Sequence, residues 1–146
     1  MNRLTDALRH LHARADRLPW DIAALPLRVF PAAVFFTSGR TKVEGFLHIK
    51  DSTWFLFQND YALPLIPPGM AAVMATAAEH VFPVLLVLGL FTRASALALL
   101  GMTLVIQTFI YPDAWQVHGV WAACFLALVL RGPGRISLDR ALRIDG

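Results

Sequence analysis

Charged residues are scarce in this chain. Of its 146 residues, 16% are charged and 57% are hydrophobic, and the mean hydropathy is +0.56. Soluble domains have about 25% charged and about 45–50% apolar residues. The imbalance excludes an ordinary soluble domain and predicts a membrane protein, and the length fits one domain.

Cysteine is almost absent too. Cys124 is the single cysteine, which excludes an intrachain disulfide and leaves no cysteine pair for thiol redox chemistry. It lies in an apolar run, where a buried structural thiol is expected. Residues 1–18 lack an apolar core, so no cleavable signal peptide is predicted.

The charge balance is basic, with a net charge of +3 and a pI of about 9.6. Most basic residues flank apolar segments, a pattern typical of charges that set membrane topology. A nucleic-acid-binding surface is therefore not indicated. The sequence also has no phosphate loop, zinc-ligand spacing or nucleophile elbow.

Long apolar segments dominate what is present. A spanning helix needs about 17–25 apolar residues, and the predicted spans are residues 18–39, 70–90, 94–111 and 115–130. The expected fold is all-α, a four-helix transmembrane bundle over residues 18–130. Residues 1–17 are basic with leucines at helical spacing, which predicts an amphipathic surface helix, with a partly disordered tail as the alternative. Residues 131–146 form a C-terminal tail, in which Ser137 is expected to cap a short helix.

The distribution of Lys and Arg predicts the orientation. Nine lie in the terminal segments and at Arg93, and three lie in the loop of residues 40–69. Both termini are therefore predicted in the cytoplasm and the loop outside. The loop carries the aromatic run 54–57, then Tyr61, which predicts an interfacial helix or reentrant cap, with a substrate lid as the alternative.

Two opposite charges lie within the predicted spans. Arg28 and Glu79 are about 15 Å and about 16 Å from the cytoplasmic ends of their helices. A lone charge at bilayer depth costs several kcal/mol, and the matching heights predict a direct ion pair. Pro31 and Pro83 each free a backbone carbonyl one turn earlier, for which the guanidinium offers donors.

Further polar residues approach the same level, namely His80, Gln107 and His118. Together with Arg28 and Glu79 they predict a polar pocket that opens outward and binds a ligand or relays protons. A structural ion pair that fixes helix register, without any ligand, is the alternative. The histidines and Glu79 are metal-ligand types, but nothing in their spacing requires a metal.

Three motifs follow in order along the chain. They are Arg28 with a small-Gly-x-x-Lys run that ends at Lys42, Glu79 with an L-G-L-x-T-R run that ends at Arg93, and a G-P-G-x-x-S-L-D run that ends at Asp139. Over residues 25–142 the pattern resembles the DoxX family of small four-helix membrane proteins. The resemblance implies a polytopic protein of the bacterial inner membrane, with Lys42, Arg93 and Asp139 as supporting motif residues.

DoxX-family members have been linked to thiosulfate–quinone oxidoreductases, redox-stress complexes and metal-stress operons. The resemblance thus implies an accessory subunit that holds a quinone-like molecule, or a membrane or periplasmic redox or metal-handling partner, around Arg28 and Glu79. Quinone is the suggested cofactor, and a homo-oligomer is an open expectation. The missing cysteine pair favours a protein that is not catalytic alone. A membrane subunit of a quinone-linked oxidoreductase and a small proton-coupled transporter, with Glu79 as proton carrier, are the alternatives.

Overall fold

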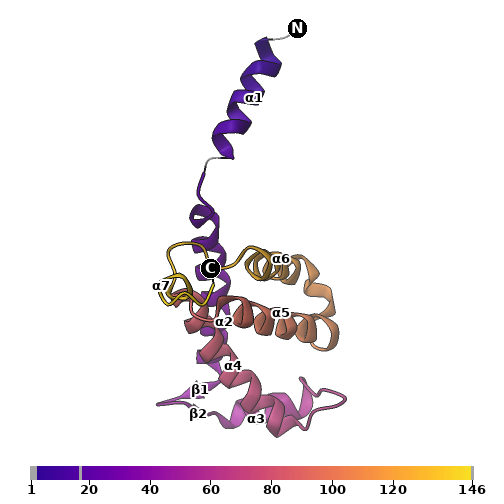
Figure 1. Ribbon diagram of the computed structural model, residues 1–146. Helices are drawn as coiled ribbons and strands as arrows, with labels where there is room; N and C mark the ends of the chain where they lie inside the picture. Colours follow the sequence, from indigo (N-terminus) through magenta and orange to yellow (C-terminus); the bar gives the residue numbers. More distant parts are fainter. Residues whose placement is uncertain (1–2, 17, 146) are drawn as a thin grey trace.

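The computed structural model describes residues 3–16 and 18–145 (Figure 1). Within them, four helical segments are long and apolar enough to cross a membrane. The helices are α2 (Asp21–Thr41), α4 (Pro68–Leu88), α5 (Thr92–Phe109) and α6 (Trp115–Arg131), the last preceded by the 3-10 turn η1 (Pro112–Ala114). The predicted all-α transmembrane bundle is confirmed. Arg17 and Gly146, which belong to the predicted terminal segments, lie outside the described residues.

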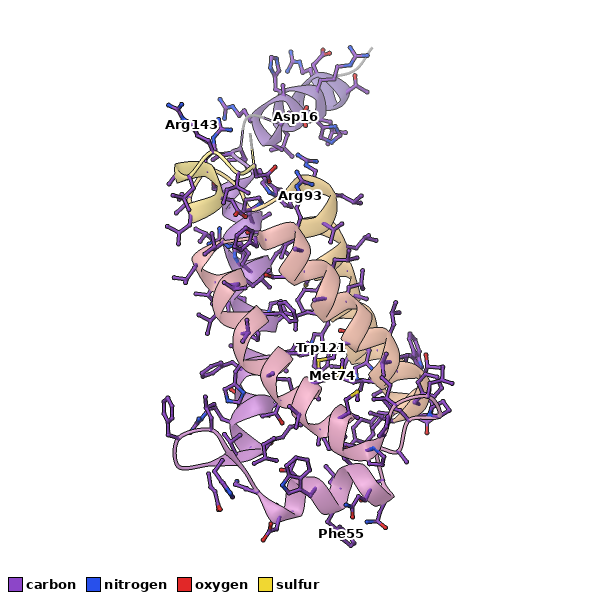
Figure 2. All side chains as sticks on the ribbon, turned by 60° about the horizontal axis from the view of Figure 1, so that its bottom comes forward. Asp16, Phe55, Met74, Arg93, Trp121 and Arg143 are labelled. Atoms are coloured by element: carbon purple, nitrogen blue, oxygen red, sulfur yellow. The ribbon has the colours of Figure 1, made fainter. Side chains whose placement is uncertain are left out.

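Short elements flank the bundle. They are α1 (Arg3–Ala15), β1 (Val43–Glu44), β2 (His48–Ile49), α3 (Asp51–Asn59) and α7 (Leu138–Ala141). We call the end that holds the start of α2, the α4–α5 turn and α7 the terminal end, and the opposite end, with β1, β2 and α3, the loop end (Figure 1). In Figure 2, Arg93 and Arg143 lie at the terminal end and Phe55 at the loop end, with Met74 and Trp121 between them.

The bundle core is apolar and aromatic. Phe35 on α2 packs edge-on against Trp121 and Phe125 on α6, with ring centroids 5.2 and 5.6 Å apart. Leu86 and Leu99 are fully buried beside them. Large apolar side chains are also exposed along all four helices, as expected for surfaces that face lipid rather than water.

The long loop contains the predicted helix, α3, next to a short hairpin. Val43 pairs with Ile49 in this hairpin, and Gly45 takes a positive φ of 53° in its turn. Phe57 on α3 packs against Ala71 and Ala72 on α4. The small side chains on α4 let α3 lie close, so α3 forms a cap over the loop end of the bundle.

The C-terminal tail folds back on the terminal end. The Ser137 hydroxyl accepts a hydrogen bond from the Arg140 N–H at 3.2 Å, which confirms the predicted cap of the short helix α7. The Asp21 carboxylate accepts hydrogen bonds from the backbone N–H groups of Arg135 and Ile136. These contacts join the tail to the start of α2.

Candidate functional site

The predicted ion pair between Arg28 and Glu79 is wrong. The Arg28 guanidinium lies beside the last turn of α4, where it donates to the Leu86 carbonyl at 2.9 Å. Glu79 lies beside Gly39 near the other end of α2. Eleven residues separate positions 28 and 39, which is about 16 Å along a helix. The prediction assumed that α2 and α4 end at one level, whereas α2 extends beyond the end of α4 at the terminal end.

Arg28 holds the terminal end together. Besides the Leu86 carbonyl, its guanidinium donates to the carbonyls of Val87 at 2.7 Å, Pro133 at 2.9 Å and Ile136 at 2.7 Å. Leu86 and Val87 lie in the last turn of α4, where carbonyls lack the N–H partner four residues on that they would have inside a helix. The freed carbonyls before Pro31 and Pro83 are not among these acceptors. Because four backbone groups surround the guanidinium, Arg28 acts as a structural connector between α2, α4 and the tail.

Asp139 has a similar structural role. Its carboxylate accepts from the backbone N–H groups of Phe91 at 2.7 Å and Thr92 at 2.8 Å, which are the unpaired donors at the start of α5. Its own N–H donates to the Gly89 carbonyl at 2.8 Å. Gly89 has a φ of 68°, and a Cβ there would lie 2.6 Å from the Ser137 Cβ. The second and third sequence motifs therefore contact each other directly.

Arg93 completes this end of the bundle. Its guanidinium pairs with the Asp145 carboxylate at 3.2 Å and donates to the carbonyls of Val129 and Leu130 at the end of α6. Both partners of the ion pair are partly exposed. Of the three supporting motif residues, Arg93 and Asp139 thus connect helix ends at the terminal end, and Lys42 lies at the loop end.

Lys42 is the ion-pair partner of Glu79. The Lys42 ammonium lies 2.6 Å from the Glu79 carboxylate, and the two side chains are 11% and 4% exposed. The Ser38 hydroxyl donates to the same carboxylate at 3.2 Å and accepts from Lys42 at 3.0 Å. Lys42 also follows the last turn of α2, where a positive charge is favourable. These three residues form the polar triad of the loop end.

Gly39 lets the two helices of the triad approach closely. A Cβ at this position would lie 3.0 Å from the Glu79 Cβ and 3.0 Å from the His80 ring. The small-Gly-x-x-Lys motif therefore has a physical explanation. Ser38 and Lys42 supply polar groups, and Gly39 brings α4 within reach of them.

An apolar cavity of about 260 Å³ lies beside the triad. Ser38, Lys42 and Glu79 form its polar wall, and Phe57 and Tyr61 cover it from the side of α3. Most other lining residues are apolar, among them Met74, Ala75 and Ala78 on α4 and Met102 and Val105 on α5. Met74 and Val105 are also 54% and 37% exposed, which places an opening between α4 and α5 on the lipid-facing surface.

Two tyrosines bridge the outer edge of this cavity. The hydroxyls of Tyr61 and Tyr111 are hydrogen-bonded to each other, and both residues line the cavity. Burial, followed by this hydrogen bond, raises the pKa of the Tyr61 phenol above its ordinary value. Tyr61 therefore stays protonated at neutral pH and connects the loop to the end of α5.

A smaller cavity of about 130 Å³ adjoins the first. Ser38 and Glu79 line both cavities, and His118 and Trp121 line the smaller one. The buried His118 ring is hydrogen-bonded to the Gln107 carbonyl oxygen through Nδ1 at 2.7 Å. Glu79 and His118 therefore line one small cavity, and Gln107, which lines neither cavity, is hydrogen-bonded to His118.

His80 points to a different side of α4. Its Nδ1 is 2.7 Å from the Thr76 carbonyl oxygen, and its ring packs edge-on against Phe36 with centroids 5.6 Å apart. Within residues 3–16 and 18–145, its Nε2 is buried without a hydrogen-bond partner. His80 supports the α2–α4 contact, and neither it nor Arg28 lines the two cavities.

Sequence reasoning missed Ser38 and Tyr111 as members of the site and gave Lys42 a supporting place only, whereas it placed Tyr61 in the loop for which a substrate lid was the alternative. The signal for Lys42 was available, because it stands one helical turn after Ser38 at the end of a span that faces a buried acid. The contact between Tyr61 and Tyr111, 50 residues apart, leaves no local pattern in the sequence.

Comparisons with known proteins agree with this architecture. The DoxX family model matches residues 23–112. A Haemophilus influenzae protein described as uncharacterized is 32% identical over 133 residues, which cover 84% of each chain. The inner membrane protein YphA of Escherichia coli strain K12 is 31% identical over 133 residues, which cover 82% of this chain and 89% of YphA. No solved structure matches the chain. With its four apolar helices, the chain belongs to the DoxX family and is a polytopic inner-membrane protein.

Proposed function

We propose that this chain is an accessory membrane subunit that holds a small lipophilic molecule with a quinone-like head in the cavity beside Glu79. The observation that carries the proposal is the open space next to a buried ion pair. A purely structural pair gains from close packing on every side. The triad of Ser38, Lys42 and Glu79 instead borders a cavity of about 260 Å³.

The chemistry of the triad fits both forms of a quinone. An ammonium carries three donors, and Lys42 directs them at the Glu79 carboxylate, the Ser38 hydroxyl and, at 3.5 Å, the Ser38 backbone carbonyl. The third contact is long, and a quinone carbonyl would take its place. The Glu79 carboxylate is suited to accept from a quinol hydroxyl. One site therefore offers a partner to the oxidised and to the reduced head group.

The cavity walls fit the rest of such a molecule. Small-molecule sites are mostly apolar with a few placed polar groups, and they enclose about 300–1,000 Å³. The larger cavity approaches this range, and the adjoining cavity of about 130 Å³ extends it toward His118. The opening between α4 and α5 gives a lipophilic molecule a route from the bilayer.

The proposal assigns binding to this chain and electron transfer to a partner. The polar groups of the cavity are an amine, a carboxylate, hydroxyls and an imidazole, and the sequence has no cysteine pair. We infer that a membrane or periplasmic redox or metal-handling protein carries out the chemistry. In this arrangement the chain would present or store the quinone for a redox-stress or metal-stress process.

We also propose that both termini are cytoplasmic, so the cavity lies in the outer half of the bundle. The nine-to-three distribution of Lys and Arg supports this orientation. Reporter fusions after residue 146 and in the loop near Lys50 should give opposite signals. A periplasmic signal from the C-terminal fusion would reverse the orientation.

Filling the cavity tests the proposal directly. Ala75 lines it, whereas Ala77 on the same helix is exposed on the outer surface. We expect decylubiquinone to raise the melting temperature of the detergent-purified wild type and of Ala77→Leu in a saturable way. Ala75→Leu should lose that response because its side chain occupies the space, while its melting temperature without ligand stays close to wild type.

A lipid-like control separates head-group recognition from general partitioning. We expect 1-decanol, which has an alkyl chain and no quinone head, to produce no saturable shift. A saturable response to decylubiquinone that persists in Ala75→Leu, or its absence from the wild type, would refute the quinone proposal.

A further inference from the structure

The terminal end has a hollow of about 440 Å³ of its own, at the opposite end of the bundle from the triad. Its lining is strongly basic. Four arginines border it, together with the Trp20 ring and two aspartates; the charged residues are Arg93, Arg131, Arg135, Arg140, Asp21 and Asp145. Positive charge therefore exceeds negative charge around one recess.

Internal partners neutralise little of this charge. Asp145 pairs with Arg93, and the Asp21 carboxylate is used by backbone N–H groups of the tail. The Arg131 guanidinium lies over the Trp20 ring, 5.0 Å from its centroid. Across residues 3–16 and 18–145, the side chains of Arg131, Arg135 and Arg140 form no ion pair. Three guanidinium groups thus remain available around the hollow.

The surroundings of the hollow are those of a bilayer interface. Ile22 at the start of α2 and Leu130 at the end of α6 are 60% and 68% exposed, and Leu18, just before α2, is 62% exposed. The Trp20 indole N–H donates to the Gly132 carbonyl at 3.0 Å, and tryptophan is enriched at the level of lipid head groups. Figure 2 shows Arg93 and Arg143 at this end.

We propose that this hollow binds the phosphate of an anionic phospholipid. Guanidinium groups bind phosphate oxygens through paired N–H donors. The exposed apolar residues of α2 and α6 provide a surface for the acyl chains, which a free phosphate ion does not need. The bound lipid would neutralise the arginines and fix the tail against α2, independently of any molecule in the triad cavity.

Native mass spectrometry of the full chain in a mild detergent tests the proposal. The protein is titrated with phosphatidylglycerol and with phosphatidylcholine of identical acyl chains. We expect one phosphatidylglycerol to bind in preference to phosphatidylcholine. The triple variant Arg131→Gln/Arg135→Gln/Arg140→Gln should weaken that binding by at least about tenfold, since it removes three basic groups that attract the anionic head group.

A matched triple variant removes the same charge elsewhere. Arg3→Gln/Arg9→Gln/Arg14→Gln changes exposed positions on α1 and should leave phosphatidylglycerol binding unchanged. The double variant Arg135→Gln/Arg140→Gln provides a milder test if the triple variant fails to fold, and it should give an intermediate loss.

Three results would overturn the proposal. Equal binding of the two lipids would remove the head-group preference. Equal losses in the two triple variants would show a general effect of net charge. Displacement of the bound phosphatidylglycerol by millimolar inorganic phosphate would identify a free-phosphate site instead.

Discussion

At the terminal end, the Arg28 guanidinium is surrounded by four backbone carbonyls, and Asp139 by two backbone N–H groups. At the loop end, the Lys42 ammonium and the Glu79 carboxylate border a cavity of about 260 Å³. Both ends bury charge, but Lys42 and Glu79 line a cavity, whereas Arg28 and Asp139 line none of the three hollows described above. Buried charge in a membrane helix therefore locates a functional site only when the space next to it is considered as well.

The largest effect is expected from Arg28→Gln. The shorter amide cannot reach four carbonyls, so several buried acceptors lose their donors and the free energy of unfolding should fall by about 3–5 kcal/mol. Arg28→Lys keeps the charge but has fewer donors, so its free energy of unfolding should lie between those of the wild type and Arg28→Gln. Unfolding in detergent measures both, and a loss below about 1 kcal/mol for Arg28→Gln would contradict the structural role.

Substitutions of Lys42 and Glu79, the ion pair of the loop end, should be strongly coupled. Each should lower the free energy of unfolding by less than Arg28→Gln does. Lys42→Gln and Glu79→Gln are each expected to cost about 1.5–3 kcal/mol, because each removes hydrogen bonds between charged groups at the wall of a cavity. The double variant should cost less than the sum, with a coupling energy of about 0.5–3 kcal/mol. The partly exposed pair of Arg93 and Asp145 is the control, and its coupling should be about 0–1 kcal/mol. Strict additivity for Lys42 and Glu79 would show that they do not interact.

Gly39→Ala probes the close approach that positions the triad. The added Cβ would lie 3.0 Å from side-chain atoms of Glu79 and His80, and such overpacking costs about 1–3 kcal/mol. Gly101→Ala on α5 is the matched change, because a Cβ there has nothing within 4 Å. It should leave stability unchanged or raise it by up to about 1 kcal/mol. Equal changes in the free energy of unfolding for Gly39→Ala and Gly101→Ala would show that the α2–α4 contact is not tight.

The smallest effect is expected from Tyr61→Phe, which removes the hydrogen bond to Tyr111. The free energy of unfolding should fall by about 0.5–1.5 kcal/mol, and decylubiquinone should be released faster because the edge of the cavity is less firmly held.

The raised pKa of Tyr61 means that the folded state keeps the phenolic proton to a higher pH than the unfolded state does. Wild-type stability should then fall as the pH rises past about 10, and the variant should lose part of that dependence. An unchanged pH profile would contradict this assignment.

The sequence was sufficient to predict the fold and individual residues of the candidate site. Hydropathy located the four spans, because the bilayer fixes the length and composition of a spanning helix. Glu79, Gln107 and His118 stood out as polar groups at depth. The structure places Glu79 and His118 at the smaller cavity and bonds Gln107 to His118.

The pairing of Arg28 could not be obtained in the same way. Heights counted from helix ends assume level ends, but the tail packs against the first turn of α2 and α2 extends past α4. Position 39, which packs against Glu79, lies eleven residues or about 16 Å along α2 from position 28, so Lys42 and not Arg28 reaches the carboxylate.

The most direct test of the contrast between the two ends is a decylubiquinone binding isotherm for wild type, Glu79→Gln and Arg28→Lys, measured below the melting temperature of each. We predict that Glu79→Gln weakens binding at least about tenfold, which corresponds to about 1.4 kcal/mol. Arg28→Lys should bind like wild type although it is the less stable protein. Normal binding by Glu79→Gln together with lost binding by Arg28→Lys would place the site at the terminal end and contradict the account.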